Sequence, residues 1–397
     1  MYPLTLSRFT LTTCLGVGLE PHRQGIVAGR SGLTPFRIAG DVFETHVGEV
    51  STLPDRRLPV PLAEWDCRNN RLAYTALQQD DFLESVFRAA SSYGRRRIGV
   101  FVGTSTSGIR ETEEAFARLD ANGSLPGDFR YRNTHSCFSV ADFVRQVLKL
   151  EGPAFVISTA CSSSAKVFPA AARMISAGII DAAVVGGVDT LCLTTLFGFR
   201  SLELTASSAC KPFDVARSGI SIGEAGAFAL LEKPERSAIP GDIALLGAGE
   251  SSDAYHMSSP HPEGLGARLA IRAALESAQR PPEDIDYVNL HGTGTRTNDS
   301  AEDLAVIHTI GRQTPCSSTK GATGHTLGAA GAVEAVLSAL AIQEQLIPGG
   351  VTTDVIDPGL HCNFVRTPRR ARIRRVLSNS FGFGGSNCAL ILGKATE

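Results

Sequence analysis

Cys161 lies in a sequence context typical of a nucleophilic cysteine. It follows the apolar run 154–158 and precedes an Ala-rich stretch, which predicts a turn between the end of a strand and the start of a helix. Unpaired N–H groups and the helix dipole favour an anion there, so we expect the pKa of the thiol to lie below its ordinary value of about 8.5. The alternative is a buried, inert cysteine, which we expect for the other eight of the nine cysteines.

His291 opens a second loop of small residues. It follows the apolar run 287–290, and loops at the ends of parallel strands are where α/β folds place their sites. Thr293 and Thr295 offer hydroxyls to a polar ligand, and the glycines beside them allow close backbone approach. The alternative is a histidine with a structural role in the loop.

His325 ends a third such segment, 318–325, which also contains Lys320. Glu334 follows on a Gly/Ala-rich stretch that predicts a helix. A lysine and a glutamate near a histidine can fix its tautomer and orientation. The alternative reading of the glycines is tight helix packing, and a phosphate-binding loop is excluded because the order GxxxxGK[ST] is absent.

Phe381 and Phe383 belong to a fourth segment, in which glycines separate and follow the two aromatic residues. This pattern predicts a mobile loop with exposed backbone amides, which could stabilise an oxyanion. The alternative is a strained turn whose aromatic side chains belong to the core.

The elements around these loops indicate an α/β protein with a mostly parallel sheet covered on both faces. A break in periodicity at 234–242 predicts two halves, 1–240 with Cys161 and 241–397 with His291 and His325. Pro169 lies within the helix predicted after Cys161, so we expect that helix to begin later or to kink near Ala165. The predicted strands are 97–103, 154–158, 181–186, 243–247, 287–290 and 387–392, and the predicted helices are 111–119, 140–150, 265–277 and 300–310.

Composition excludes several classes of protein. The 397 residues include 38 Lys and Arg against 40 Asp and Glu, and this net charge of −2 argues against a nucleic-acid-binding protein. The hydrophobic content of 43% excludes a disordered chain. We expect no membrane span and no signal peptide, because no apolar run approaches about 18 residues and the N-terminus lacks a basic leader. The nine cysteines are scattered and form no C-x-x-C pair, which predicts a reduced, cytoplasmic protein without a zinc ribbon.

Taken together, the four segments resemble the β-ketoacyl-acyl carrier protein synthases, the elongating condensing enzymes of fatty acid and polyketide synthesis. The resemblance covers nearly the whole chain and implies the thiolase fold, with two similar α/β halves in an αβαβα arrangement. It also implies a dimer. The matching motifs, in the family order, are TACSSS (159–164), KPFDVARSGISIGEAGAFALLE (211–232), SSDAYHMSSPHPEG (251–264), HGTGT (291–295), KGATGH (320–325) and NSFGFGG (379–385).

The resemblance also implies roles for single residues. Cys161 would accept the acyl group, and His291 and His325 would bind the malonyl thioester, promote loss of carbon dioxide and stabilise the enolate. Lys320 and Glu334 would order the histidines. The oxyanion and gating residues would be Cys161, Phe383 and Phe381, and Thr293 and Thr295 would line the phosphopantetheine tunnel.

The implied reaction needs no metal and no permanently bound cofactor, because the acyl carrier protein supplies the phosphopantetheine arm. That carrier is typically acidic, so a basic docking patch is expected. The candidates are Arg56, Arg57, Arg130, Arg132 and the run Arg369–Arg375, for which a solvated loop is the alternative.

The segments 191–210 and 133–138 look like those of synthases for specialised products such as aryl polyenes. In that branch an active synthase can pair with a chain-length factor, so a homodimer and a heterodimer both stay open. Two other functions are a non-catalytic subunit like the chain-length factor, which lacks the nucleophile present here, and a cysteine hydrolase. A hydrolase needs one general-base histidine and leaves the second histidine unexplained.

Overall fold

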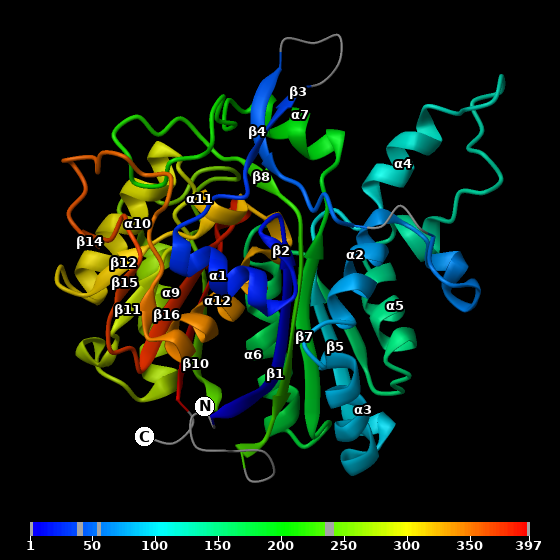
Figure 1. Ribbon diagram of the computed structural model, residues 1–397, viewed down its shortest axis with the longest axis horizontal. Coiled ribbons are helices and arrows are strands. Elements are labelled where there is room, and N and C mark those ends of the chain that lie inside the picture. The colour runs from blue at the N-terminus through cyan, green and yellow to red at the C-terminus, as the bar shows by residue number, and fades with distance from the viewer. Residues whose placement is uncertain (1–2, 38–42, 54–56, 235–241, 395–397) are drawn as a thin grey trace.

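The apolar runs of the sequence form a twelve-stranded sheet in a computed structural model, which describes residues 3–37, 43–53, 57–234 and 242–394 (Figure 1). The sheet consists of two halves that meet where β1 pairs with β10. The first half has the order β6 (Ala154–Ile157), β5 (Ile98–Gly103), β7 (Ala182–Asp189), β9 (Ala225–Glu232) and β1 (Leu4–Thr13). The second has the order β14 (Asn363–Phe364), β12 (Pro315–Ser317), β11 (Tyr287–Asn289), β16 (Arg375–Phe381), β17 (Ser386–Lys394) and β10 (Ile243–Ser252).

The two halves have the same arrangement of strands, as expected for the thiolase fold, apart from the additional strand β14 at the edge of the second half. In each half, parallel strands continue into an antiparallel series, through β7, β9 and β1 in one and through β16, β17 and β10 in the other. The prediction of a mostly parallel sheet was therefore wrong. Strands buried on both faces are apolar throughout whatever their direction, so the residue pattern does not reveal which way each strand runs.

Helices cover and separate the two halves in five layers. The helices α6 (Ser163–Ser176) and α12 (Ala330–Glu344) lie between the halves and share one hydrophobic core with both (Figure 1). Alternate side chains of the strands point outward into two further cores. The helices of one outer layer are α2 (Arg68–Leu77), α3 (Phe82–Tyr93) and α5 (Ser139–Val147), and those of the other are α9 (Leu265–Ala278) and α10 (Arg296–Thr309).

Shorter elements complete the fold around the ends of the strands. The helix α4 (Ile109–Phe116) begins an arm that projects from the body (Figure 1). The other helices are α1 (Leu19–Ala28), α7 (Leu193–Ser201) and α11 (Lys320–Thr323). The small strands are β2 (Gly16–Val17), which pairs with β1, the set β3 (Thr34–Arg37), β4 (Glu44–Gly48) and β8 (Ile222–Gly223), and the pair β13 (Leu346–Ile347) and β15 (Arg369–Arg370).

The predicted helices and strands exist, and the differences lie at their ends. The helix predicted at 111–119 ends at Phe116, the helix at 300–310 begins at Arg296, and the strand at 243–247 continues to Ser252. The predicted boundary between the halves at 240/241 falls in 235–241, outside the described residues.

Pro169 does not interrupt the helix that contains it, so the expected late start of α6 was wrong, whereas the expected kink stays a prediction. The helix begins at Ser163 and continues through Pro169 to Ser176. Pro169 and its neighbours Val167, Phe168 and Ala171 are buried, and tertiary packing therefore outweighs the lost backbone hydrogen bond.

Among the residues that the structure describes, one helical stretch, Leu327–Glu344, is long and apolar enough to span a membrane. In this protein 89% of it is buried between the two sheet halves, so packing inside the fold accounts for its composition.

Candidate active site

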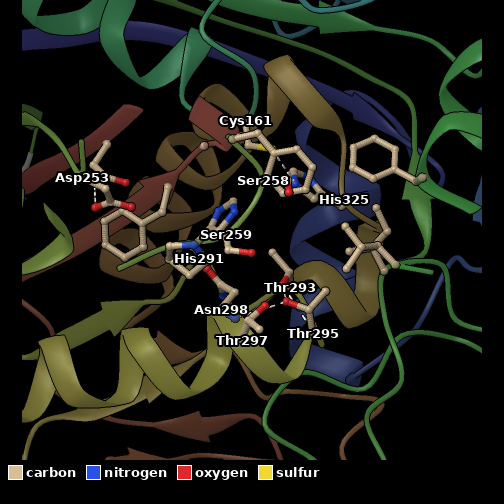
Figure 2. Close-up of a pocket in the computed structure, with 18 residues that line it drawn as sticks. Cys161, Asp253, Ser258, Ser259, His291, Thr293, Thr295, Thr297, Asn298 and His325 are labelled. Atoms are coloured by element: carbon tan, nitrogen blue, oxygen red, sulfur yellow. Dashed lines mark hydrogen bonds between the residues drawn. The ribbon is translucent and has the colours of Figure 1, made fainter. Parts of the chain in front are cut away.

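A strained turn presents the Cys161 sulfur. β6 ends at Ile157, and Ala160 adopts a left-handed conformation with φ of 52° directly before Cys161. α6 then begins two residues later, at Ser163, so the sulfur lies at the N-terminus of a helix as predicted. The side chain is buried and faces the cavity where His291 and His325 also point (Figure 2).

His325 lies directly against the sulfur, with Nε2 3.1 Å from Sγ of Cys161. Its other ring nitrogen, Nδ1, accepts a hydrogen bond of 3.2 Å from the backbone N–H of Leu327. Burial and the nearby Lys320 hold the pKa of His325 well below its usual value, so the ring is neutral. A neutral ring that accepts at Nδ1 carries its proton on Nε2, and His325 therefore directs an N–H group at the sulfur.

His291 faces His325 across the cavity, with ring centroids 5.3 Å apart and planes at 86°. Its Nδ1 lies 3.3 Å from Nζ of Lys320, which as an ammonium group can only donate. The pKa of His291 is also held well below its usual value, first by burial and then by Lys320 and His325. The His291 ring is therefore neutral and accepts at Nδ1, so it carries its proton on Nε2, on the side of the ring away from Lys320.

Glu302 holds the loop that carries His291. Its two carboxylate oxygens accept hydrogen bonds from the backbone N–H groups of His291, at 2.8 Å, and Gly292, at 2.7 Å. The side chains of Asn298 and Asn379 donate to the same carboxylate. Burial raises the pKa of Glu302 to about 7, against the lowering effect of these hydrogen bonds.

Lys320 and Glu334 form a buried ion pair beneath the histidines. Nζ of Lys320 donates to Oε1 of Glu334 and to the backbone carbonyl of His291, in addition to its contact with the ring. Both side chains are almost fully buried. Burial raises the pKa of Glu334 to about 7, opposed mainly by Lys320.

The expectation of a lowered thiol pKa was wrong. Burial raises the pKa of Cys161 to about 11, although Lys320 and a hydrogen bond from the backbone N–H of Phe383 act in the opposite direction. Desolvation outweighs these effects because the sulfur lies in a narrow cavity lined by aromatic side chains. In the resting site, Cys161 is therefore a thiol surrounded by hydrogen-bond donors.

The remaining predicted residues line the same cavity. Phe381 lies beside His291, with ring centroids 6.0 Å apart, and the hydroxyl oxygens of Thr293 and Thr295 lie 2.9 Å from each other. Phe383 packs against Phe199 of α7, with ring centroids 5.7 Å apart. The structure thus brings together all nine residues singled out in the sequence.

Sequence reasoning missed several cavity residues. Asp253, Ser258, Ser259 and Pro260 come from the loop between β10 and α9, whose motif matched the family although it contained no recognisable chemistry. Other missed residues lie beside the predicted ones or on α7 and the segments that follow it: Phe199, Leu204, Ile220, Thr297, Asn298 and Asn387. No pattern in the sequence marks Phe199 as a residue of the site.

Cys161, His291 and His325 place a sulfur and two ring nitrogens within 4.8 Å of one another, close enough for one metal ion. Histidines that bind metals usually donate their second N–H group to a carboxylate or a carbonyl. Here the second nitrogen of each ring accepts instead, from Leu327 and from Lys320, which leaves protons on the nitrogens that would have to bind the ion. The hydrogen bonds therefore favour donation to an oxygen over coordination of a metal.

The predicted docking arginines do not lie in one place. Arg57 and Arg130 line a wide groove beside α4, whereas Arg56 falls outside the described residues. In the run 369–375, Arg374 and Arg375 pair with Asp286 and Asp284, and Arg370 donates to the carbonyl of Glu344. Much of this run is therefore engaged in contacts within the fold.

Comparisons with known proteins agree with this geometry. A family model described as the beta-ketoacyl synthase N-terminal domain matches residues 70–237, and one described as the C-terminal domain matches 243–354. The 3-oxoacyl-[acyl-carrier-protein] synthase 2 of Vibrio harveyi is 34% identical over 316 residues, 76% of each chain. The enzyme of the same name from Coxiella burnetii is 31% identical over 409 aligned positions, 96% of each chain. A chain in the complex of the ketosynthase ApeO with its chain length factor ApeC, from Xenorhabdus doucetiae, is 40% identical with a TM-score of 0.91, covering 99% of this chain and 98% of that one.

Proposed function

The chain belongs to the β-ketoacyl synthase family of acyl-transferring condensing enzymes, and from this premise we propose that it condenses malonyl-acyl carrier protein with an acyl group on Cys161. The products are 3-oxoacyl-acyl carrier protein and carbon dioxide. The observation that carries the proposal is the pair of neutral imidazoles beside the sulfur, each with its Nδ1 accepting a hydrogen bond and its proton on Nε2.

In the first step, the Cys161 sulfur attacks the carbonyl carbon of the acyl thioester on the carrier. The bond to the phosphopantetheine sulfur breaks, and that sulfur leaves with the proton lost by the thiol. The carbonyl oxygen becomes an oxyanion, which the backbone N–H groups of Cys161 and Phe383 would stabilise. The backbone N–H group of Phe383 lowers the pKa of the Cys161 thiol, so it lies near the reacting atom.

In the second step, the malonyl group loses carbon dioxide, and the electrons of the broken C–C bond form an enolate. The Nε2–H groups of His291 and His325 would both donate to the enolate oxygen. No strong base is needed, because the electron pair comes from decarboxylation. The enolate carbon attacks the acyl carbonyl, and the Cys161 thiolate leaves and takes up a proton from solvent.

Lys320 and Glu334 would act as positioning residues in this scheme. Lys320 donates to Nδ1 of His291 and so keeps the proton of that ring on Nε2, while Glu334 balances the buried ammonium group. Thr293 and Thr295 would contact the polar pantetheine arm, and Phe381 and Phe383 would border the acyl chain. No permanently bound cofactor is required.

The other two functions find less support. A cysteine hydrolase needs an imidazole that accepts the thiol proton, but His325 presents an N–H group to the sulfur. A non-catalytic subunit does not require the complete set of Cys161, His291 and His325.

We further propose that the chain works as a heterodimer with a chain-length factor, in elongation of a specialised product such as an aryl polyene. The similarity to the complex of ApeO and ApeC supports this pairing. β6 ends the order of the sheet, and Phe155 on it is 44% exposed. The unpaired backbone groups of an edge strand are a template on which a strand of a second chain can pair. We propose a cytoplasmic location, supported by nine free cysteines.

In the direct test, the protein is purified together with any partner that copurifies with it. Acyl-carrier and malonyl-carrier are then added as substrates. We expect carbon dioxide release and a 3-oxoacyl-carrier product by mass spectrometry, and an acyl group trapped on Cys161 when malonyl-carrier is omitted. A Cys161→Ala variant that retained full condensation would refute the nucleophile, and free fatty acid as the main product would favour a hydrolase. Native mass spectrometry of the copurified sample distinguishes a homodimer from a heterodimer.

A further inference from the structure

The helix α7 brings an aromatic ring into the active-site cavity. Of its nine residues, only Leu196 is buried. Phe199, one turn later, lines the cavity and contacts the ring of Phe383. Phe197 and Arg200 both contact the buried ring of Phe43, at 6.1 Å between ring centroids and 4.7 Å from the guanidinium carbon to the ring centroid. Leu196 and Phe43 belong to one small hydrophobic core, and Phe199 packs against this core from the cavity side of the helix.

Glu113 of α4 makes polar contacts with the N-terminus of this helix. Its carboxylate accepts hydrogen bonds from the backbone N–H groups of Leu193, at 3.0 Å, and Thr194, at 2.6 Å, and from the Thr194 hydroxyl, at 2.6 Å. The helix cap position is Cys192, whose side chain makes no capping bond. A carboxylate from another element thus satisfies the first N–H groups of α7 and complements its dipole.

The helix α4 is itself tied to the body of the protein at a second point. Glu111, two residues before Glu113, accepts a hydrogen bond of 2.6 Å from the backbone N–H of Arg68, the first residue of α2. The helix α4 therefore connects the N-terminus of α2 to the N-terminus of α7. A continuous series of contacts runs from α2 through α4 and α7 to Phe199 and Phe383.

We propose that Glu113 is a positioning residue for the acyl gate. By fixing the N-terminus of α7, it sets where Phe199 lies against Phe383 and so limits the width of acyl group that can reach Cys161. This inference rests on the proposed acyl transfer to Cys161 and adds two residues to it, Phe199 as a specificity-determining side chain and Glu113 acting through it. Removal of either side chain widens the gate and favours bulky acyl groups over slender ones.

The test compares acylation of Cys161 by two carrier-bound donors, one ending in a phenyl ring and one a short straight chain, followed by intact-protein mass spectrometry. The interaction energy of an aromatic pair corresponds to a change in a rate constant of about two- to twelve-fold. Phe199→Ala should therefore raise kcat/KM for the phenyl donor, relative to kcat/KM for the straight-chain donor, by about that factor. Loss of a carboxylate at a helix N-terminus corresponds to about two- to five-fold, which we expect for Glu113→Ala. The matched control is Glu114→Ala, the next residue of the same helix, which contacts Arg110 and should leave the ratio unchanged.

The decisive comparison is the double variant. If Glu113 acts through Phe199, Glu113→Ala should change the ratio no further in the Phe199→Ala background. Carbon dioxide release from malonyl-carrier should be unchanged in Glu113→Ala, because no histidine contact is altered. Additive effects in the double variant, or an equal loss with both donors, would overturn the proposal.

Glu113→Gln provides a second variant if Glu113→Ala fails to fold, since it keeps the size of the side chain and removes the negative charge at the helix N-terminus. An unchanged ratio in this variant would also count against the role of that charge. The outcome is distinct from failure of the proposed function, in which the unaltered protein would form no acyl-Cys161 with either donor.

Discussion

Replacement of His325 by glutamine and by leucine distinguishes a hydrogen-bond donor from a base. Glutamine places an amide nitrogen near the position of Nε2, so it can donate but cannot take up a proton from the thiol. Leucine fills a similar space and can do neither. If His325 stabilises the enolate through its Nε2–H, the glutamine variant should be more active than the leucine variant. If His325 acts as a base, both variants should lose the same activity.

The expected size of the effect follows from the geometry. Loss of one preorganised donor to an oxyanion lowers kcat by about 10²- to 10³-fold, or about 2.7–4 kcal/mol. We expect His325→Leu to release carbon dioxide from malonyl-carrier more slowly than the unaltered protein by that factor. His325→Gln should release it at least about ten-fold faster than His325→Leu. His308→Gln, on the exposed face of α10, is the matched control and should behave as the unaltered protein.

The assay is carbon dioxide release from malonyl-carrier without an acyl donor, because this step needs the enolate but no acyl transfer. Thermal melting of each variant checks that the buried substitution leaves the protein folded. Equal activity of the leucine and glutamine variants would refute the donor role. Titration of the His325 ring itself between pH 8 and pH 6 would also contradict it, because the lowered pKa of His325 keeps the ring neutral over that range.

Three further results are expected. The rate of Cys161 alkylation by iodoacetamide should rise about ten-fold per pH unit from pH 7 to pH 10, since the thiol pKa is raised to about 11; a plateau below pH 8 would show a thiolate at rest. Lys320→Met should lower carbon dioxide release more than acylation of Cys161, because Lys320 contacts the His291 ring and not the sulfur, and equal losses in both assays would argue for general disruption of the site. The pKa of Glu302 is about 7 in the folded protein, so the unfolded chain binds fewer protons than the folded one between about pH 4.5 and 7, and stability should fall as the pH rises through that window. Glu302→Gln should flatten the dependence of stability on pH that thermal melts measure. An unchanged dependence would show that other groups cause it.

Much of the fold and the centre of the site follow from local sequence patterns. Cys161 and His291 each follow an apolar run and enter a small-residue loop, His325 ends a third loop of small residues, and such loops meet where strand ends meet. Strand direction could not be predicted, because β9 and β17 are as apolar as the parallel strands beside them. The raised pKa of Cys161 was also beyond prediction, since it depends on how tightly distant segments enclose the sulfur.

Phe199 illustrates the limit of pattern reasoning at the site. It lies on a short helix with a single buried residue, and nothing in its neighbours distinguishes it from Phe197, which faces the surface. Its place in the cavity is set by where α7 lies relative to Phe383, and that depends on Glu113, far away in the sequence. Contacts of this kind become visible only in three dimensions.

The protonation of the two histidines is the feature on which the mechanism depends most. Nitrogen-15 NMR of the protein labelled at histidine, with the signals of His291 and His325 assigned by substitution, reports which ring nitrogen carries the proton. We predict neutral rings with the proton on Nε2 in both, unchanged between pH 6 and 8. A proton on Nδ1 of either ring, or titration within that range, would contradict the account.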